Sequence, residues 1–403
     1  MSRTFVTLGK RPKVLVVLAE VVVAVTRLLK AALGALLLCT FSCIASVLPS
    51  DRADVMYHSY SGGGVSIDGP AVMLRSKVAQ DFSVAGYYYI DTVSGASIDV
   101  VATASAYSEE RTEKHLGVDY LAGNSLISTN FSTSDENDYH AKTITFGISH
   151  DTFGGLTTLN LQTGLGDDEV GKNGDINFKE QVRRYNYKLG LTQILTTNWI
   201  AALNIQFDLD EGFLNNPYRQ VRFKDPTAAL GYSYQAEIYP RTRNSSAVSL
   251  VNKYYLPYRA AIGLSVRHYQ DSWDISANDV ELEYVHPLGK DWTFEGKVRY
   301  YQQTEASFYK DLFEYANELN FMARDKELSD FSNVTAGLGV SYKLPSYGIF
   351  SRQLQPEMTV QWDHIIFNYN NFRNVTDRTS AAGAEPLYQL DANVVRAFVS
   401  LYF

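Results

Sequence analysis

From residue 54 onward, apolar and polar residues alternate in stretches of about ten residues, the length of a transmembrane β-strand. The clearest example is 292–301, in which Trp292, Phe294, Val298 and Tyr300 share one face. The opposite face carries Glu, Lys and Arg. A period of two is typical of a strand whose two faces have different surroundings. Because the charged face needs water, we expect the apolar face to meet lipid.

Fifteen stretches of this kind follow one another along the chain: 72–78, 82–91, 108–121, 124–132, 140–149, 155–165, 181–195, 197–208, 244–255, 258–270, 277–286, 291–303, 331–344, 356–369 and 391–403. Short turns, such as 80–81, alternate with longer polar connections, and the longest of these lie near 93–107, 166–180, 209–243, 304–330 and 370–390. Outer-membrane barrels have short turns on the periplasmic side and long loops outside.

The order of these connections indicates one more strand. Because the turn at 80–81 is short, the strand before it runs toward the periplasm, and an outward-running strand must precede that one. Residues 54–59 or 64–67 can supply it. The sequence therefore predicts an all-β fold, a transmembrane antiparallel up-and-down β-barrel of about sixteen strands, with long extracellular loops and periplasmic termini.

The last nine residues, 395–403, form an amphipathic stretch that ends on an aromatic residue, Phe403. Such an ending is similar to the assembly signal of bacterial outer-membrane barrels, whose last strand closes against the first. We therefore predict that the barrel assembly machinery recognises this strand. An ordinary edge strand of a soluble sheet is the alternative interpretation of this stretch alone.

Residues 1–50 differ from the rest of the chain. They contain six Lys and Arg residues and one acid, followed by an apolar run over 31–47. We interpret them as a signal or targeting segment with cleavage between Ala45 and Ala53, with a membrane anchor as the alternative. Both cysteines, Cys39 and Cys43, lie here. The predicted mature chain, one domain over 54–403, then has no disulfide or cysteine metal site.

Composition excludes several classes of protein. Only 45% of the residues are hydrophobic, which excludes a bundle of membrane-spanning helices. Aromatic residues make up 13%, which suits a barrel with aromatic girdles. The formal charge is −8 for the whole chain and −13 without residues 1–50, which argues against a nucleic-acid partner.

Five stretches resemble a bacterial family of unassigned function predicted to form outer-membrane barrels: 94–100 leading to 108–111, 134–139, 211–219, 237–243 and 323–328. The third reads EGFLNNPYR and the fourth includes EIYPRTR. The resemblance implies a barrel without an obvious catalytic set and without a settled substrate. It also suggests a small periplasmic lipoprotein, or a redox- or metal-related protein, as a partner. The long N-terminal segment departs from the family pattern and puts the start codon in doubt.

Charged residues in phase with the polar faces are the candidates for lining the lumen. They are Arg75, Lys77, Asp91, Arg184, Lys188, Asp208, Arg267, Glu281, Glu283, Glu295, Lys297, Arg299, Asp363 and Arg396. Both signs are present, so charge alone predicts no ion selectivity.

The long loops contain a second candidate set of charges. We expect Arg219, Arg222, Arg241 and Arg243 to come near Glu211 and Glu237, either as a constriction or ligand site or as ion pairs that order a loop. Loops 209–243 and 304–330 are long enough to plug the lumen, and residues 308–315 could form a short amphipathic helix.

Metal and catalytic signals are weak, and we predict no cofactor. An oxygen-rich loop with Asp167, Asp168, Glu169 and Asp175 could suit Ca²⁺, but its spacing is not that of an EF-hand and a solvated loop is favoured. Ser149-His150-Asp151 is the only run of Ser, His and acid. Neighbouring strand residues point to opposite faces, so these three cannot form a triad alone.

Three functions fit this pattern. The first is a porin-like channel, or the barrel component of an envelope complex. The second is a plugged scaffold or sheath for a periplasmic partner. The third is a barrel enzyme acting on lipid or envelope polymer, which the lack of a catalytic set makes the weakest of the three.

Overall fold

A computed structural model describes residues 47–95, 107–349 and 352–403, which lie in one compact unit, Ala45–Phe403. Sixteen long strands form its wall: β1 Arg52–Gly62, β2 Val65–Ala79, β3 Phe82–Gly95, β4 Tyr107–Ala122, β5 Ser125–Asp135, β6 Tyr139–Thr152, β7 Thr157–Val170, β8 Glu180–Thr196, β9 Trp199–Gly212, β12 Thr242–Tyr255, β13 Ala261–Asp271, β14 Ser276–Leu288, β15 Trp292–Gln303, β16 Phe331–Lys343, β18 Arg352–Arg373 and β19 Leu387–Tyr402. Between them lie a hairpin, β10 Gln220–Lys224 and β11 Tyr232–Ala236, the short strand β17 Tyr347–Ile349, and two 3₁₀ turns, η1 Phe153–Gly155 and η2 Lys326–Leu328.

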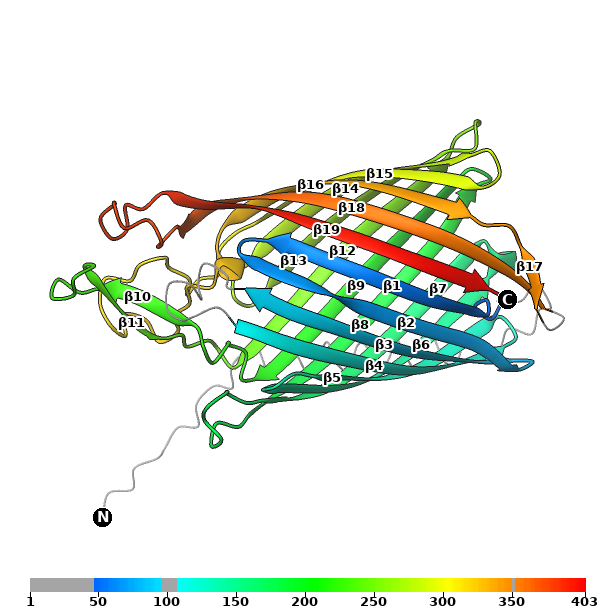
Figure 1. The fold of residues 1–403 in the computed structure, drawn as a ribbon. Coiled ribbons are helices and arrows are strands. Elements are labelled where there is room, and N and C mark those ends of the chain that lie inside the picture. The colour runs from blue at the N-terminus through cyan, green and yellow to red at the C-terminus, as the bar shows by residue number, and fades with distance from the viewer. Residues whose placement is uncertain (1–46, 96–106, 350–351) are drawn as a thin grey trace, which may run out of the picture. The chain divides into compact units, whose positions relative to one another are not determined.

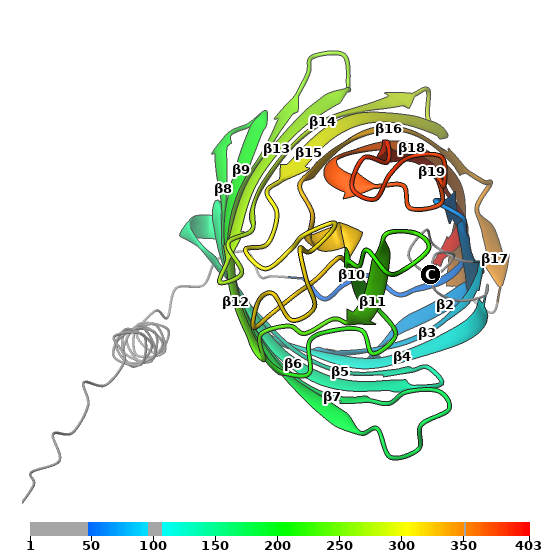
Figure 2. The same ribbon diagram turned by 90° about the vertical axis from the view of Figure 1, so that its left-hand side faces the viewer.

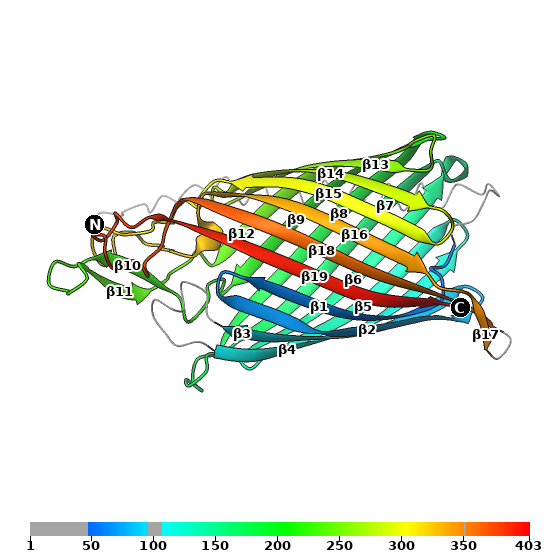
Figure 3. The same cartoon turned by 45° about the horizontal axis from the view of Figure 1, so that its top comes forward.

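The wall closes on itself (Figures 1 and 3). Each strand pairs antiparallel with the next, β9 pairs with β12 across the β10–β11 hairpin, and β1 pairs with β19 from Arg52↔Tyr402 to Gly62↔Ala392. The predicted sixteen-stranded up-and-down barrel is thus confirmed. The extra first strand is β1, which contains 54–59, whereas 64–67 belongs largely to β2.

The two faces of the wall differ as the sequence pattern predicts. On β15, Trp292, Phe294, Val298 and Tyr300 are 44–56% exposed, whereas Glu295, Lys297 and Arg299 are less accessible. The same alternation leaves Val72 and Leu74 of β2 and Val395 and Val399 of β19 exposed on the outside. Apolar surface on every strand of a closed wall is stable only in lipid, where closure leaves no backbone edge. The protein is an outer-membrane β-barrel.

Aromatic side chains gather on the outer wall near the short-turn end. Phe82 stacks on Tyr120 with their ring centroids 4.6 Å apart, and Trp292 lies 4.5 Å from Tyr342. All four lie near the ends of their strands, on the side of the barrel where most connections are short. Amphipathic rings of this kind favour the membrane–water interface, so they mark the periplasmic boundary of the lipid-facing band.

The two ends of the barrel differ in loop length. Connections at the end that contains both described chain termini are short, for example 80–81 and 123–124, where Gly123 has a φ of 60°. The opposite, extracellular end contains three long segments, 213–241, 304–330 and 374–386. We call these three segments the cap. Figure 2 shows β10, β11 and their neighbours lying across part of the barrel mouth.

The cap is held together by backbone pairing and by a hydrophobic core. Ile238 and Met322 exchange backbone hydrogen bonds of 2.7 and 3.0 Å in an antiparallel bridge. In a parallel bridge, the N–H of Phe313 donates to the carbonyl of Arg222 and its carbonyl accepts from the N–H of Lys224, both at 2.9 Å. Trp273 and Phe308 pack edge-on within a larger buried cluster that also includes Tyr239, Phe331 and Phe372. The loops therefore form an ordered layer and not a set of separate arms.

Two expectations about local structure are wrong. Residues 308–315 form no helix, because their backbone groups pair with neighbouring cap segments, as in the parallel bridge Tyr309↔Ala323. Asp167, Asp168 and Glu169 lie in β7 and not in a loop, because β7 continues its pairing with β6 and β8 to Val170. The predicted signal segment 1–50 falls almost entirely, and the stretch 96–106 falls wholly, outside the described residues.

The facing of β15 predicts unequal responses to two substitutions. Val298→Arg puts a charge among lipid tails, which costs about 2–4 kcal/mol near the membrane midplane. We expect it to reduce the amount of folded, heat-modifiable barrel in outer membranes. Lys297→Ala, the matched control on the opposite face, should assemble normally. Normal assembly of Val298→Arg combined with failure of Lys297→Ala would mean that the facing is inverted.

Candidate functional site: the inner wall and the cap

Asp363 of β18 binds two cations on the inner wall. Nζ of Lys297 lies 3.0 Å and Nη2 of Arg396 lies 2.5 Å from its carboxylate oxygens. Lys297 reaches Asp363 across β16, where Gly337 is the register partner of both. A Cβ at Gly337 would lie 2.6 Å from Cε of Lys297, so the missing side chain leaves the space in which this ion pair forms.

A second charged group joins β1, β3 and β4. The buried carboxylate of Asp91 lies 2.7 Å from Nε2 of His58 and 2.7 Å from Nη2 of Arg111. Tyr89 stacks on His58 at 4.7 Å and also contacts Arg111 through its ring face. Nearer the periplasmic end of the barrel, Arg75 of β2 binds Asp119 of β4 at 2.9 Å.

The other sequence-predicted lining residues divide into paired and unpaired groups. Arg184 binds Asp168 at 2.7 Å and Asp210 at 3.3 Å, and Arg299 binds Asp279 at 3.2 Å. The weaker contacts are Lys253 to Glu283 at 3.7 Å, Gln361 to Glu295 at 3.3 Å, Gln206 to Asp208 at 2.7 Å and Arg267 over the ring of Tyr269. Within the described residues, Lys77, Lys188 and Glu281 have no ion-pair partner within 4.0 Å.

Sequence reasoning missed several partners in these groups, namely His58, Arg111, Asp119, Asp210 and Asp279. Each lies on the inward face of its strand, in phase with the neighbours that were singled out. A complete count of charged residues at that phase would have found them. Their pairing could not be found in this way, because it depends on the register between neighbouring strands.

A buried group of charges locks the three cap segments together. Arg222 is fully buried and binds Glu385 through Nη1 and Asp311 through Nη2, and its Nε donates to the Asp311 carbonyl at 2.9 Å. Arg324, 4% exposed, binds the same Asp311 at 3.0 Å, and its backbone N–H donates to Glu237 at 2.7 Å. Each cap segment thus contributes at least one member. We call Arg222, Asp311, Arg324 and Glu385 the cap lock.

The cap lock affects the protonation of its glutamate. Burial by itself would raise the pKa of Glu385, but the hydrogen bonds and charge of Arg222 outweigh this effect and lower it below the ordinary value. The carboxylate of Glu385 therefore remains charged in the folded cap at neutral pH.

Three of the loop arginines form ion pairs with acids other than the two that the sequence suggested. Arg222 binds Asp311 and Glu385, Arg241 binds Glu180, and Arg243 binds Asp271, instead of Glu211 or Glu237. Arg219 contacts Asp325, and Glu237 accepts from the hydroxyl of Tyr239 at 2.8 Å. The acids at 271, 311, 325 and 385 come from connections distant in sequence, which a local pattern cannot match.

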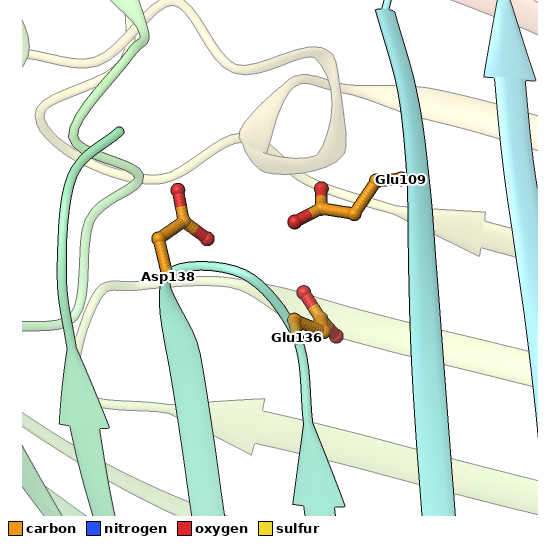
Figure 4. Close-up of side chains that lie close together, drawn as sticks. All are labelled: Glu109, Glu136 and Asp138. Atoms are coloured by element: carbon orange, nitrogen blue, oxygen red, sulfur yellow. The ribbon is translucent and has the colours of Figure 1, made fainter. Parts of the chain in front are cut away.

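The oxygen-rich set that was considered for Ca²⁺ does not converge. Asp168 is directed inward and binds Arg184, whereas Asp167 and Glu169 are exposed on the other face of β7, and Asp175 follows in the 171–179 loop. A different acid cluster forms nearby, with carboxylate oxygens of Glu109, Glu136 and Asp138 within 4.8 Å of one another (Figure 4).

The surroundings of this second cluster raise the pKa of two neighbouring groups. Burial raises the pKa of Glu136, and the charge of Glu109 raises it further. Asp138 accepts a hydrogen bond from the hydroxyl of Tyr218, whose pKa is raised to about 12 by burial and by this bond. Asp138 is therefore already tied to the cap.

The run Ser149-His150-Asp151 lies at the periplasmic end of β6. Nδ1 of His150 is 2.8 Å from the hydroxyl of Ser125, and Asp151 accepts from Thr158 at 2.6 Å. The histidine and the aspartate therefore have different partners, and the three residues of the run do not form a triad.

Comparison of the sequence with protein families supports the resemblance. Residues 173–355 match the model of a family described as protein of unknown function (DUF3570). The match covers less than half of the chain. The DUF3570 region runs from the loop before β8 to the start of β18 and includes two of the three cap segments. It also contains the stretches 211–219, 237–243 and 323–328. The predicted resemblance to a barrel family of unassigned function is confirmed.

No curated protein matches the sequence. Among solved structures, the chain is similar to the siderophore receptor PirA from Acinetobacter baumannii, with a TM-score of 0.44, 10% identity and coverage of 88% of this chain. The chain spans 60% of that receptor's length. A bacterial polysaccharide outer membrane secretin gives a TM-score of 0.45 at 8% identity, covering 88% of this chain and 99% of the other. OccK2 (OpdF) from Pseudomonas aeruginosa, in complex with glucuronate, gives a TM-score of 0.42 at 11% identity, covering 88% of this chain and 98% of the other. At these scores, none of the three indicates a substrate.

Removal of Arg222 should loosen the cap without unfolding the barrel. Arg222→Ala leaves the buried carboxylates of Asp311 and Glu385 without this partner, and breaking a buried pair costs about 3–5 kcal/mol. We expect protease added to intact cells to cleave within 213–241 or 304–330, while the barrel remains heat-modifiable.

Lys224→Ala is the control for this experiment. Lys224 binds Glu314 in the same cap at 2.7 Å, but both side chains are about half exposed or more, and such pairs contribute about 0–1 kcal/mol. It should resist protease as wild type does. Equal resistance of Arg222→Ala would contradict the role of the cap lock.

The cap should also loosen in acid. The folded pKa of Glu385 is lowered, so its contribution to stability is complete above its ordinary pKa of 4.5 and is lost as pH falls through the lowered value. Protection factors of the cap amides, which compare the measured hydrogen-exchange rate with the intrinsic rate at the same pH, should stay constant from neutral pH to about pH 5. They should decrease below about pH 4. Glu385→Gln should exchange faster at neutral pH and show a smaller acid-dependent decrease in protection. Identical acid profiles for the two proteins would exclude Glu385 as the cause.

Proposed function

We propose that the protein is an outer-membrane channel whose extracellular mouth is narrowed by the cap. The carrying observation is the polarity of the inner wall. Its charged groups bind one another but keep contact with water: the side chains of Lys297 and Arg299 are 32% and 35% exposed, and that of Arg396 is 36% exposed. Sixteen strands enclose enough space for an aqueous lumen.

The distribution of apolar groups supports an open lower lumen. The inward-facing hydrophobic core consists of cap residues, of Trp273 and Ile275 in the β13–β14 turn, and of side chains at the extracellular ends of strands, for example Phe331, Tyr369 and Phe372. Toward the periplasm the wall instead presents pairs such as Lys297–Asp363 and Arg75–Asp119. A channel of this design would admit small polar solutes around an ordered cap, and the cap would set the size limit.

A plugged scaffold is the second candidate, because the cap lies across part of the mouth and its core is well packed. In that case the barrel would present a docking surface and conduct no ions. Conductance in planar bilayers separates the two functions. Steady openings of the purified wild-type barrel support the channel, and their absence both in wild type and in Arg222→Ala supports the scaffold.

Asp363 should control the ion selectivity of the channel. Asp363→Asn removes the negative charge that neutralises Lys297 and Arg396, so the lumen wall gains net positive charge. We expect the reversal potential in a salt gradient to shift toward anion preference. Asp391→Asn is the matched control, since Asp391 is exposed on the outer face of β19, and it should leave the reversal potential unchanged. Equal shifts in both variants, or none in either, would contradict a conducting path along this wall.

A further inference from the structure

The chemistry of the inner wall changes around the barrel. At the middle of β13 to β15, most inward positions are charged, for example Arg267, Glu281 and Lys297. From β5 round to β9 they are mainly hydroxyl, amide and glycine residues. Examples are Asn130, Thr145, Gln162, Asn186 and Asn204. From β19 to β4, across the seam at which the barrel closes, the middle of the inner wall instead carries aromatic rings and thioethers.

The side chains of this last region face the lumen in two neighbouring register rows. They are Phe398, Met56, Met73, Tyr87, Tyr89 and His115, and we call them the lumen patch. Phe398 is the register partner of Met56, and Met56 and Tyr89 are both partners of Ala71. Because register partners have Cβ atoms about 5 Å apart, this row is continuous from β19 to β3.

The second row lies one inward position nearer the periplasm. Met73 of β2 pairs with Tyr87 of β3, and Tyr87 pairs with His115 of β4. The rings of the two rows contact one another: Tyr87 and Tyr89 have centroids 6.0 Å apart, and His115 packs edge-on against Tyr87 at 5.1 Å. The two rows therefore form one apolar surface that extends from β19 to β4.

The lumen patch is accessible from the lumen. All six side chains are partly exposed, and that of His115 is 36% exposed. Since they point inward from the wall, their exposed surface faces the lumen and not lipid. Among the described residues, neither buried hydrophobic cluster of the cap includes a member of the patch. An apolar surface that stays in contact with water in this way is typical of a ligand-binding site.

Hydrogen-bonding groups border the lumen patch at both ends. Toward the extracellular side, Arg396 is the next inward residue after Phe398 on β19. Toward the periplasm, Arg75 is the next inward residue after Met73 on β2. Each arginine binds its acidic partner through one nitrogen, and the two side chains are 36% and 25% exposed. Because a guanidinium carries several N–H groups, both have donors left for the oxygen atoms of a ligand.

From this arrangement we infer that the lumen patch binds small aromatic solutes that carry hydroxyl or carboxylate groups. The inference rests on the proposed channel and names the class of solute that would pass through it. The ring of such a solute would lie against Tyr87 and Met56, because aromatic rings pack favourably on other rings and on thioethers. Its oxygen atoms would accept hydrogen bonds from Arg396 or Arg75.

The position of the patch excludes larger occupants. A protein partner or a membrane lipid would have to enter a closed barrel whose mouth is partly covered by the cap, so a small solute is the ligand that can reach the patch. A saccharide fits less well, because Met56, Met73 and Phe398 offer its hydroxyl groups no good hydrogen bond.

The test is a calorimetric titration of purified, folded barrel in detergent with para-hydroxybenzoate. The matched probe is its cyclohexane analogue, which keeps the hydroxyl and the carboxylate on a saturated ring. Ring–ring contacts should make the aromatic probe bind about two- to tenfold more tightly than this analogue. Equal affinities for the two probes would overturn the assignment to aromatic solutes.

Variants of the patch locate the binding site. Met56→Ser, Met73→Ser and Tyr87→Ser combined should lose most of the binding of para-hydroxybenzoate, whereas Tyr87→Phe alone keeps the ring and should preserve it. Unchanged binding by the triple variant would contradict a site at the patch.

A matched control changes the inner wall elsewhere. Asn130→Ser, Thr145→Ser and Gln162→Ser combined alter three inward side chains of β5 to β7 and should leave the affinity for para-hydroxybenzoate unchanged. Heat-modifiability of each variant before titration shows that lost binding does not reflect misfolding.

Single-channel recording separates this inference from the proposed function. Steady openings that para-hydroxybenzoate interrupts in wild type, and not in the triple patch variant, support both the channel and the patch. Steady openings combined with equal binding by the two proteins overturn the inference and leave the channel standing. If wild type shows no openings, the channel fails, and the calorimetry still decides whether the patch binds the probe.

Discussion

A strand in lipid has no water to hydrogen-bond its backbone, so every edge must be paired within the protein. Here the pairing of β1 with β19 meets this requirement, joining residues that are more than three hundred positions apart in the sequence. With the ring closed, side-chain alternation gives each strand a lipid face and a water face. The charged inner wall and the cap both depend on this division.

Closure also explains why the inner wall carries so many ion pairs. Side chains on the concave face come together from three or four strands, as Lys297, Asp363 and Arg396 do over Gly337. An isolated charge there would be only partly hydrated, so pairing reduces its cost. Pairing matters more in the cap, because Arg222 is fully buried there and has two acidic partners. The inner wall stays accessible to water, whereas the cap is ordered and nearly dry at its centre.

The strand pattern predicted most of the fold because period-two alternation is a local property. It identified the facing of β15, the short periplasmic turns and, through the order of connections, the need for a strand before 72–78. Strand ends were less accurate: β7 continues to Val170, and Asp167 to Glu169 are therefore strand residues. Strands remain paired beyond the part of the wall that contacts lipid, and there the sequence no longer alternates apolar and polar residues.

The cap and the charge partners could not be predicted in the same way. Arg222 was singled out, but its partners Asp311 and Glu385 are 89 and 163 positions away, in segments without regular periodicity. Residues 308–315 have a helical pattern of apolar residues, yet they pair with β10 and with Ala323 instead, because burial in the cap requires partners for their backbone groups. Both the ion pairs of Arg222 and the extended backbone of 308–315 therefore depend on partners that are distant in the sequence.

Cross-linking between the first and last strands tests barrel closure most directly. Met56 and Phe398 are register partners, and the distance between partners in antiparallel strands suits a disulfide. In a chain with Cys39 and Cys43 replaced by serine, Met56→Cys with Phe398→Cys should cross-link in outer membranes, and Met56→Cys with Ser400→Cys should not. Failure of the first pair, or equal cross-linking of both, would contradict a sixteen-stranded barrel closed in this register.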